Sequence, residues 1–273
     1  MAFIPKPHDR AYRFVVRTGL FGAWLLRLRM QFTGRENLPQ PGPMRRSGLG
    51  FSRKPVPGQG AIIAITHFGY LDFAVAEYML WKHSRAQMRF MITKGATKHW
   101  LAGPAIHATG HVIVDRSDGR DAYAGAMEKL RDGEYLAILP EAGVSRSFTV
   151  RALKTGAVRL AQETGLPIIP ISVWGGHRLM TRGHGFSWRR AWWAPIRAHV
   201  SEPIFVGPDA DVRAETERLR EELQSGIDSA ASTFPLEERE GDWWVPASRG
   251  GSAMSVSEQK RLDAAEDPVA RGR

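Results

Sequence analysis

The chain has 273 residues, 43% of them hydrophobic, a length and composition that suit one large α/β domain. It contains no cysteine, which excludes disulfides, thiolate nucleophiles and cysteine zinc sites and favours a cytosolic-facing protein. The 38 Lys and Arg residues outnumber the 28 Asp and Glu residues, giving a formal charge of +10. This excess predicts a phosphate-bearing partner (nucleic acid, anionic lipid or a phosphorylated substrate), unless it only reflects a biased genomic composition.

The first predicted element is an amphipathic helix within residues 10–32. Arg10, Arg13 and Arg17 recur at helical spacing on one side. The other side carries apolar and aromatic residues: Phe14, Leu20, Phe21, Trp24, Leu25 and Leu28. This pattern suits a helix at the membrane interface, and it equally suits a core-facing helix with a solvated basic side. The uncharged stretch is far shorter than the roughly 20 residues of a spanning helix, and no signal-peptide cleavage site is evident. We therefore predict that residues 1–33 form a membrane-associating helix that does not cross the bilayer.

Short apolar runs alternate with helical segments from residue 61 onward. Predicted strands cover residues 61–66, 89–93, 111–114, 135–139 and 168–174. Predicted helices cover residues 72–83, 98–107, 118–131, 151–164 and 209–229. The repeated β–α order predicts an α/β fold with a mainly parallel central sheet flanked by helices, in a domain that spans residues 34–232.

Two segments depart from this regular pattern. Residues 40–58 are rich in Pro, Gly and basic side chains and predict a mobile basic loop. Residues 233–273 form a polar tail, for which we predict partial docking near Trp243 and Trp244 and disorder beyond them.

Polar residues after the predicted strands are candidates for chemistry, because ligands of parallel sheets bind beyond the carboxyl ends of the strands. His67 follows the first of these strands and Asp72 opens the next helix. The helix dipole favours an ionised Asp72, which can accept a hydrogen bond from the imidazole and leave the other ring nitrogen as a base. This requires His67 to lie in the turn. The alternative is a helix-capping Asp72 beside a solvated histidine.

Further charged residues follow the other strands. Arg116 comes directly after one strand, Glu141 and Arg146 follow another, and Lys154 lies near the start of a helix. Glu141 can hold a hydroxyl or position cationic neighbours, while Arg146 can bind phosphate through its planar guanidinium. Each residue alone suits an ordinary surface charge or a salt-bridged turn. Together, at one edge of the sheet, they predict a phosphate or oxyanion pocket.

Several well-known catalytic motifs are missing. The sequence has no G-x-S-x-G elbow, no Walker-type phosphate loop and no dinucleotide G-x-G-x-x-G after a strand. Serine hydrolases, phosphate-loop NTPases and Rossmann dehydrogenases are therefore disfavoured. Metal binding through His67, Asp72 and Glu141 stays open, but their spacing matches no metal signature, so no metal site is predicted.

Four stretches resemble, in order, the motifs of the glycerophospholipid acyltransferase family, the 1-acylglycerol-3-phosphate acyltransferases in particular, in a form similar to actinobacterial members. They are THFGYLD, GHVIVDR, LPEAGVSRS and GLPIIPISVWG. The nearby GRENLP and KTG also resemble that family, and the match spans roughly residues 34–175. Four motifs in order are far more specific than any one of them.

The resemblance implies a role for each matching residue. His67 is the general base that deprotonates an acceptor hydroxyl, and Asp72 orients it. The residues implied to bind the glycerol phosphate of the acceptor are Arg116, Glu141, Gly143, Arg146, Ser147 and Lys154. Pro170 shapes the acyl-donor side. The hydroxyl attacks the thioester directly, so no covalent acyl-enzyme is needed and no cofactor is expected beyond acyl-CoA or acyl-carrier protein as co-substrate.

The sequence departs from the family pattern at three places. Thr66 stands where asparagine commonly precedes the histidine, so a supporting hydrogen bond is expected to differ. The third motif, residues 141–147, is longer than usual, which leaves the partner of Arg146 open. The basic loop before the first strand is also longer than usual.

The favoured function is acyl transfer to the sn-2 hydroxyl of 1-acyl-glycerol-3-phosphate, which makes phosphatidate for phospholipid biosynthesis. Attachment to the cytoplasmic face of the cell membrane is expected, through an anionic membrane surface that meets the N-terminal segment, the basic loop and the Trp- and Arg-rich residues 183–193. Packing near the sheet edge is the alternative for those tryptophans. Another lysophospholipid or a glycolipid acceptor stays open, as does a non-catalytic basic binding protein, although no nucleic-acid partner is expected.

Overall fold

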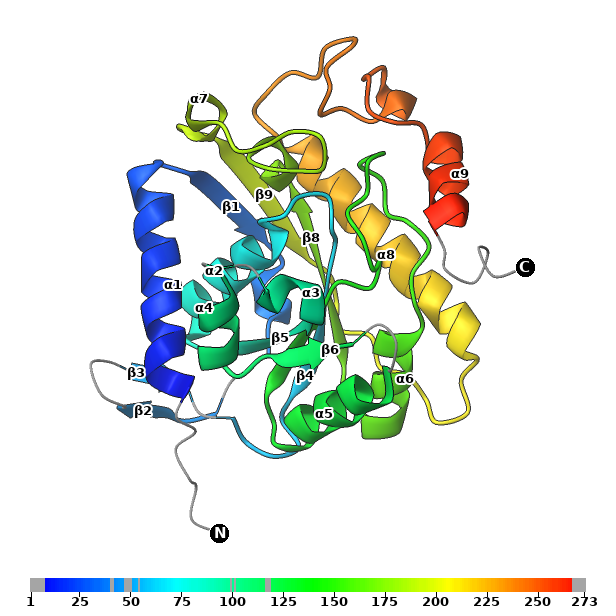
Figure 1. The fold of residues 1–273 in the computed structure, drawn as a ribbon. Coiled ribbons are helices and arrows are strands. Elements are labelled where there is room, and N and C mark those ends of the chain that lie inside the picture. The colour runs from blue at the N-terminus through cyan, green and yellow to red at the C-terminus, as the bar shows by residue number, and fades with distance from the viewer. Residues whose placement is uncertain are drawn as a thin grey trace.

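A seven-stranded sheet forms the centre of the protein, in the order β1-β9-β8-β4-β7-β5-β6 (Figure 1). The computed structural model describes residues 8–39, 42–46, 51–53, 55–98, 100, 102–115 and 119–266. The strands are β1 (Arg29–Thr33), β4 (Ala61–Ile65), β5 (Met88–Thr93), β6 (Val112–Val114), β7 (Tyr135–Ile138), β8 (Ile168–Trp174) and β9 (Pro195–Val200). Neighbouring strands run parallel except β8 and β9, which are antiparallel. The predicted α/β fold with a mainly parallel sheet is confirmed.

Helices pack on both faces of this sheet. The helices of the described residues are α1 (His8–Leu25), α2 (Asp72–Ser84), α3 (Lys94–Thr97), α4 (Ala102–Ala108), α5 (Gly119–Arg131), α6 (Gly156–Thr164), α7 (Trp188–Ala191), α8 (Val212–Ser232) and α9 (Val256–Glu266). The short 3-10 helices in the same residues are η1 (Arg35–Asn37), η2 (Gly176–Arg178) and η3 (Ala247–Arg249). Helices α5, α6 and α8 share one buried apolar cluster with the sheet, and α2 packs in the cluster on the other face.

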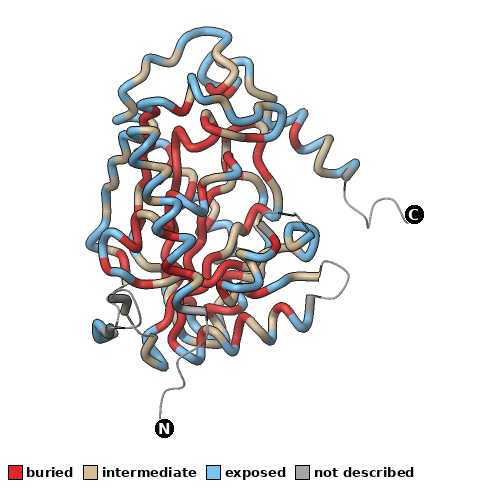
Figure 2. The backbone as a smooth tube through the Cα atoms, turned by 60° about the vertical axis from the view of Figure 1, so that its left-hand side comes forward, coloured by how far each residue is buried: buried red, intermediate tan, exposed pale blue. Residues whose placement is uncertain are grey.

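Strand β4 shows why the apolar runs are continuous. Its sequence AIIAI is buried at every position. Ile62 faces the cluster that contains α5, α6 and α8, whereas Ile63 and Ile65 face the cluster that contains α2. Because successive side chains point to opposite faces, a strand covered by helices on both sides needs apolar residues throughout. Figure 2 shows the buried backbone concentrated in the middle of the molecule, where the strands run.

The N-terminal segment is shorter as a helix than the sequence predicts. Helix α1 ends at Leu25, and residues 29–33 form the strand β1, which pairs in parallel with β9. The predicted helix within residues 10–32 is therefore confirmed over residues 10–25 and wrong over residues 29–32, which belong to the sheet. The physical reason is the partner strand β9, 160 or more residues away, whose pairing outweighs a local pattern that suits a helix. Within the described residues, no helix combines the length and apolar content needed to cross a bilayer.

The two irregular segments are more structured than predicted. Within residues 40–58, the strands β2 (Met44–Arg46) and β3 (Phe51–Arg53) form an antiparallel pair. The rest of the predicted loop lies partly outside the described residues.

The prediction of disorder beyond Trp243 and Trp244 is wrong for residues 247–266, which form η3 and α9. Trp244 and the adjacent Val245 are buried in the main apolar cluster, so the predicted docking there is observed. The docked segment leads α9 back onto the domain, where buried Gln259 contacts a loop of the core. Residues 267–273 lie outside the described part.

Candidate active site

The turn between β4 and α2 lies at the carboxyl edge of the sheet. The backbone N–H of Thr66 donates to the carbonyl of Ile171 (3.1 Å), and the Thr66 hydroxyl accepts from the N–H of Val173 (2.9 Å). Thr66 thus continues the pairing of β4 with β8 by one residue through its side chain. Thr66 occupies the position at which the motif that this sequence resembles commonly has asparagine, and its hydroxyl makes this hydrogen bond to Val173.

Asp72 holds this turn from the first position of α2. Its Oδ2 accepts from the backbone N–H groups of Phe68 (2.7 Å) and Gly69 (2.6 Å). Burial raises the pKa of Asp72 to about 8, against the two N–H donors, which lower it. The ionised Asp72 expected from the helix dipole is therefore opposed by desolvation. The turn after β8 packs closely against the carboxyl group of Asp72, because a Cβ atom at Gly176 would collide with its Oδ1.

His67 lies in the turn, as the predicted dyad requires, and is half-buried. Its Nδ1 and the Oδ1 of Asp72 are both buried, and neither has a hydrogen-bond partner in the part of the chain that the structure describes. The predicted His67–Asp72 hydrogen bond is therefore not formed in this state. The pKa of His67 is lowered to about 4, mainly by burial and to a lesser extent by the charge of Arg151, while an interaction with the backbone of Gly69 acts in the opposite direction. The imidazole is consequently neutral at pH 7 and able to accept a proton.

The loop after β7 makes hydrogen bonds to both the N–H and the carbonyl of His67. The N–H of His67 donates to Oε1 of Glu141 (2.7 Å), and the N–H of Ser145 donates to the carbonyl of His67 (2.8 Å). The other carboxylate oxygen of Glu141 accepts from the N–H of Arg151 (3.1 Å). Burial raises the pKa of Glu141 to about 7. Both oxygens of Glu141 thus bind main chain, and its visible role is to hold the His67 turn.

The same loop is fixed by a chain of hydroxyl groups. Ser145 Oγ lies 3.1 Å from Ser147 Oγ, which lies 2.8 Å from the hydroxyl of Thr149. Ala142 and Phe148 adopt left-handed backbone angles, with φ of 55° and 50°. Such angles are unfavourable for residues with a Cβ, so the surrounding contacts must impose them. The longer third motif is therefore a tightly held loop.

The other residues implied to bind the acceptor lie nearby or outside the description. Gly143 contacts the side chain of Arg151, and the N–H of Arg146 donates to Oε1 of Gln259 (2.7 Å). The side chain of Lys154 is exposed, while its N–H donates to the carbonyl of Pro140 (2.9 Å). Arg116 lies outside the described residues.

Pro170 is buried in the middle of β8, where it pairs with Ala64 of β4. It therefore lies within the sheet and not at its carboxyl edge. Its main-chain carbonyl accepts from the N–H of Ser201 (3.0 Å).

Sequence reasoning missed His177, which lies under the Asp72 turn in η2. Its ring stacks on Phe148 (centroids 4.4 Å apart) and lies 4.7 Å from Trp174. Its Nε2 lies 3.0 Å from the carbonyl of Trp244. Burial lowers the pKa of His177 to about 3, so the ring is neutral and donates this hydrogen bond. The only available signal was its place just after a predicted strand.

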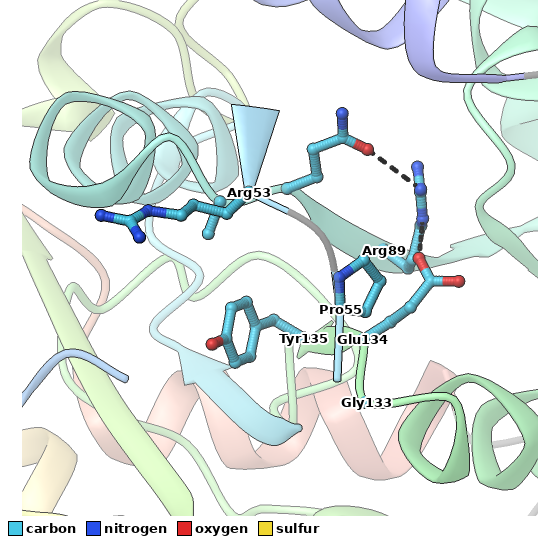
Figure 3. A pocket seen from close by; sticks show the side chains of 8 residues that line it. Arg53, Pro55, Arg89, Gly133, Glu134 and Tyr135 are labelled. Atoms are coloured by element: carbon cyan, nitrogen blue, oxygen red, sulfur yellow. Dashed lines mark hydrogen bonds and ion pairs between the residues drawn. The ribbon is translucent and has the colours of Figure 1, made fainter. Parts of the chain in front are cut away.

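A small pocket lies at the opposite edge of the sheet, beside the amino ends of β5 and β7 (Figure 3). Its wall includes Arg89, which is paired with the buried Glu134 and donates to the carbonyl of Thr109 (2.7 Å) and to Gln87 (3.1 Å). Arg89 and Glu134 are paired with each other, whereas the Nε2 of Gln87 has no hydrogen-bond partner among the described residues. The chemistry predicted from sequence lies at the other edge.

The protein thus combines an α/β fold with a neutral histidine at the carboxyl edge of its sheet. The family model described as Acyltransferase matches residues 29–174, more than half of the chain. The protein therefore belongs to the acyltransferase family and is an acyltransferase enzyme.

Similarity to individual proteins agrees with this family. The chain is 24% identical over 207 residues to a 1-acyl-sn-glycerol-3-phosphate acyltransferase of Borreliella burgdorferi, covering 75% of this chain and 70% of that protein. It is 26% identical over 180 residues to the chloroplastic LPAT1 of Arabidopsis thaliana, covering 63% of this chain but only 46% of that protein. The crystal structure of PlsC from Thermotoga maritima has a similar fold, with a TM-score of 0.60 at 20% identity over 86% of this chain and 87% of that one.

Proposed function

We propose that this enzyme transfers a fatty acyl group from an acyl thioester to the free sn-2 hydroxyl of 1-acyl-glycerol-3-phosphate, giving phosphatidate. The observation that carries the proposal is the neutral His67, held at the carboxyl edge of the sheet by Asp72 and Glu141 in a chain of the acyltransferase family. Relatives of similar sequence are named for this reaction. The donor is acyl-CoA or acyl-carrier protein, and we propose no other cofactor.

In the proposed mechanism, a ring nitrogen of His67 accepts the proton of the acceptor hydroxyl as its oxygen attacks the thioester carbonyl. The tetrahedral intermediate then collapses and its C–S bond breaks, and the departing donor thiolate takes the proton from the imidazolium to leave as a thiol. One role of Asp72 is structural, because its Oδ2 accepts the two hydrogen bonds that fix the turn. A hydrogen bond between the two unpaired atoms, His67 Nδ1 and Asp72 Oδ1, would satisfy both and orient the ring in the substrate complex.

The glycerol phosphate of the acceptor is proposed to bind beside His67, in the loop after β7. Arg146 and Lys154 supply positive charge, with Arg116 from the preceding motif, and Gly143 leaves room for the ligand. Ser147 shapes the loop through its bonds to the neighbouring hydroxyls. Pro170 is proposed to affect the donor side through the packing of β8.

The proposed site of membrane contact combines the end of α1 with the α7 loop. The N–H of Trp193 donates to the carbonyl of Leu26 (2.9 Å), and the guanidinium of Arg27 lies 5.6 Å from the centre of the Trp192 ring. Exposed aromatic residues gather on these two segments: Phe14, Phe21, Trp24, Trp188, Trp192 and Trp193. Aromatic rings mixed with arginine suit the headgroup region of an anionic membrane, and we propose peripheral attachment at the cytoplasmic face.

The test of the proposed function is the substitution His67→Ala. We expect wild type to acylate 1-acyl-glycerol-3-phosphate, and the variant to lose about 10²–10⁴ in kcat/KM because the base is gone. His83→Ala is the matched control, since His83 is exposed on the last turn of α2 and should be dispensable. Circular dichroism confirms that each variant is folded. Full activity of a folded His67→Ala enzyme would refute the mechanism.

Another lysophospholipid or a glycolipid is the second candidate acceptor. The observation in its favour is the lengthened loop of residues 141–147, in which Ala142 adopts a left-handed backbone conformation. Competing the acceptors against each other in one assay separates the two candidates. A preference for another lysophospholipid or for a glycolipid over 1-acyl-glycerol-3-phosphate would favour the second.

A further inference from the structure

The C-terminal helix α9 contacts the loop that holds His67. Gln259 is buried, and its Oε1 accepts from the N–H of Arg146 (2.7 Å). The Nε2 of the same amide donates to Oδ1 of Asp263 (2.7 Å), one turn further along α9. Through these two hydrogen bonds, Gln259 links the Asp263 carboxylate to the loop after β7 and fixes the orientation of that carboxylate.

Asp263 binds the guanidinium of Arg151 at two points. Arg151 Nε lies 3.0 Å from Oδ2, and Nη2 lies 2.7 Å from Oδ1. The Arg151 side chain is 19% exposed and the Asp263 side chain is 30% exposed. A two-point pair of this kind fixes the plane of the guanidinium as well as its position.

The fixed guanidinium lies next to the candidate active site. Its Nη1 lies so near Gly143 that a Cβ there would come within 2.8 Å of it. The N–H of Arg151 binds Oε2 of Glu141, whose Oε1 holds the N–H of His67. One carboxylate therefore connects the main chains of Arg151 and His67. With Nε and Nη2 turned toward Asp263, Nη1 is the part of the guanidinium left facing the loop.

We propose that Asp263 is a positioning residue of the acceptor site, which holds Arg151 beside Gly143 so that its guanidinium binds the acceptor phosphate. This inference rests on the proposed function, because it assigns the phosphate of that acceptor to a particular cation. It makes α9, a helix outside the family match at residues 29–174, part of the substrate site.

The first experiment compares Asp263→Asn with the wild type in the full-length protein. We expect the KM for 1-acyl-glycerol-3-phosphate to rise roughly tenfold, with kcat changed by less than about twofold, because a phosphate ligand is misplaced while the base is intact. Glu238→Gln is the matched control: it breaks another ion pair of the C-terminal segment, with Arg249 (3.2 Å), away from the loop. It should leave both constants unchanged. An unchanged KM in Asp263→Asn overturns the proposal.

Exchanging the charges of Arg151 and Asp263 distinguishes two roles of Asp263: positioning the Arg151 guanidinium, or only keeping α9 docked against the loop. In the double variant Arg151→Asp with Asp263→Arg, the ion pair can form again but the cation now lies on α9. We expect hydrogen exchange to show that α9 stays docked while the KM remains raised. Recovery of the wild-type KM would mean that α9 only supports the loop, and the proposal fails.

Direct binding of glycerol 3-phosphate distinguishes failure of this proposal from failure of the proposed function. Binding is measured by calorimetry, without turnover. If the wild type binds glycerol 3-phosphate and Asp263→Asn binds it more weakly, the Arg151 site stands even if acylation of 1-acyl-glycerol-3-phosphate is absent. If the two bind equally, or neither binds, the proposal is overturned.

Discussion

His67, Asp72 and Glu141 share one physical property, which is that burial favours the neutral form of each. Burial lowers the pKa of His67 to about 4 and raises those of Asp72 and Glu141 to about 8 and about 7. Desolvation is the largest cause in all three cases, ahead of hydrogen bonds and neighbouring charges. The histidine is thereby kept as a free base at neutral pH, which general base catalysis requires.

The pH dependence of kcat/KM follows from the lowered pKa of His67. Because the folded enzyme holds a neutral imidazole down to about pH 4, activity should persist as the pH falls through about 6.5, where an ordinary histidine becomes protonated. We expect the acid limb near a pH of about 4, where the imidazole of His67 takes up its proton. The measurement is kcat/KM between about pH 4 and 9 for wild type and Asp72→Asn. An acid limb near pH 8 that disappears in Asp72→Asn would contradict this and show that Asp72 must be ionised.

At the scale of elements, the 3-10 helix η2 joins the turn that contains His67 to the C-terminal segment. Gly176 faces Asp72, while the next residue, His177, contacts Phe148 of the loop after β7 and the carbonyl of Trp244. The guanidinium of Arg178 lies 4.7 Å from the centre of the Trp244 ring. Three segments far apart in sequence therefore meet at one buried histidine. Stability of this junction should be sensitive to the charge of His177.

His177→Phe tests this junction through the pH dependence of unfolding. The folded pKa of His177, about 3, lies below that of the unfolded chain, so the unfolded state alone takes up the proton as the pH falls from about 6.5. This group costs the wild type about 2 kcal/mol between pH 7 and pH 5. Phe cannot titrate, although the lost hydrogen bond to Trp244 costs about 1 kcal/mol at pH 7.

Urea unfolding of both proteins at the two pH values measures the difference. We expect the deficit of His177→Phe at pH 7 to shrink or reverse at pH 5. Equal losses of stability in the two proteins on acidification would show that His177 does not carry the effect. Buried carboxyls with raised pKa act in the opposite direction in both proteins, so the comparison cancels them.

At the scale of the whole molecule, the directions of the strands place the end of α1 and the α7 loop, which carry exposed aromatic residues, at the edge of the sheet where His67 lies. β9 runs antiparallel to β8, so its first residues lie beside the carboxyl end of β8, where Arg197 pairs with Trp174. β1 runs parallel to β9 and begins at the same edge, directly after α1 (Figure 1). The end of α1, the α7 loop and the candidate site thus share one edge of the sheet. A lipid acceptor would reach His67 from a membrane held at that edge.

Vesicle binding tests this surface. Trp188 and Trp192 are 68% and 54% exposed, and replacing both by serine should weaken binding to vesicles with an anionic lipid by roughly tenfold or more. Phe205→Ser is the matched control, because Phe205 is 67% exposed and follows Ile204, which pairs with Ile168 at the opposite end of β8. Sedimentation with vesicles gives the affinities. Equal loss in the control and the tryptophan variant would argue against a defined surface.

Much of the fold was predictable because its signals are local. The strand over residues 168–174 and the helices over 72–83 and 118–131 follow from apolar runs and periodicity, and the structure confirms them within a residue or two. The predicted helix over 151–164 begins only at Gly156, since the preceding residues are held in the loop that contacts Glu141. Strands β1 and β9 were not predicted, because each depends on a partner distant in sequence.

The sequence alone determined the β–α order over residues 61–174, the motifs that resemble those of acyltransferases and the place of His67 after a strand, since all of these depend on neighbouring residues. Only the tertiary structure decided that Glu141 holds the main chain of His67, and that α9 brings Asp263 to Arg151. It also decided the direction in which the pKa values of His67 and Asp72 shift, since both shifts arise mainly from burial. The physical reason is that desolvation and long-range pairing depend on how the chain packs, and a local pattern does not contain that information.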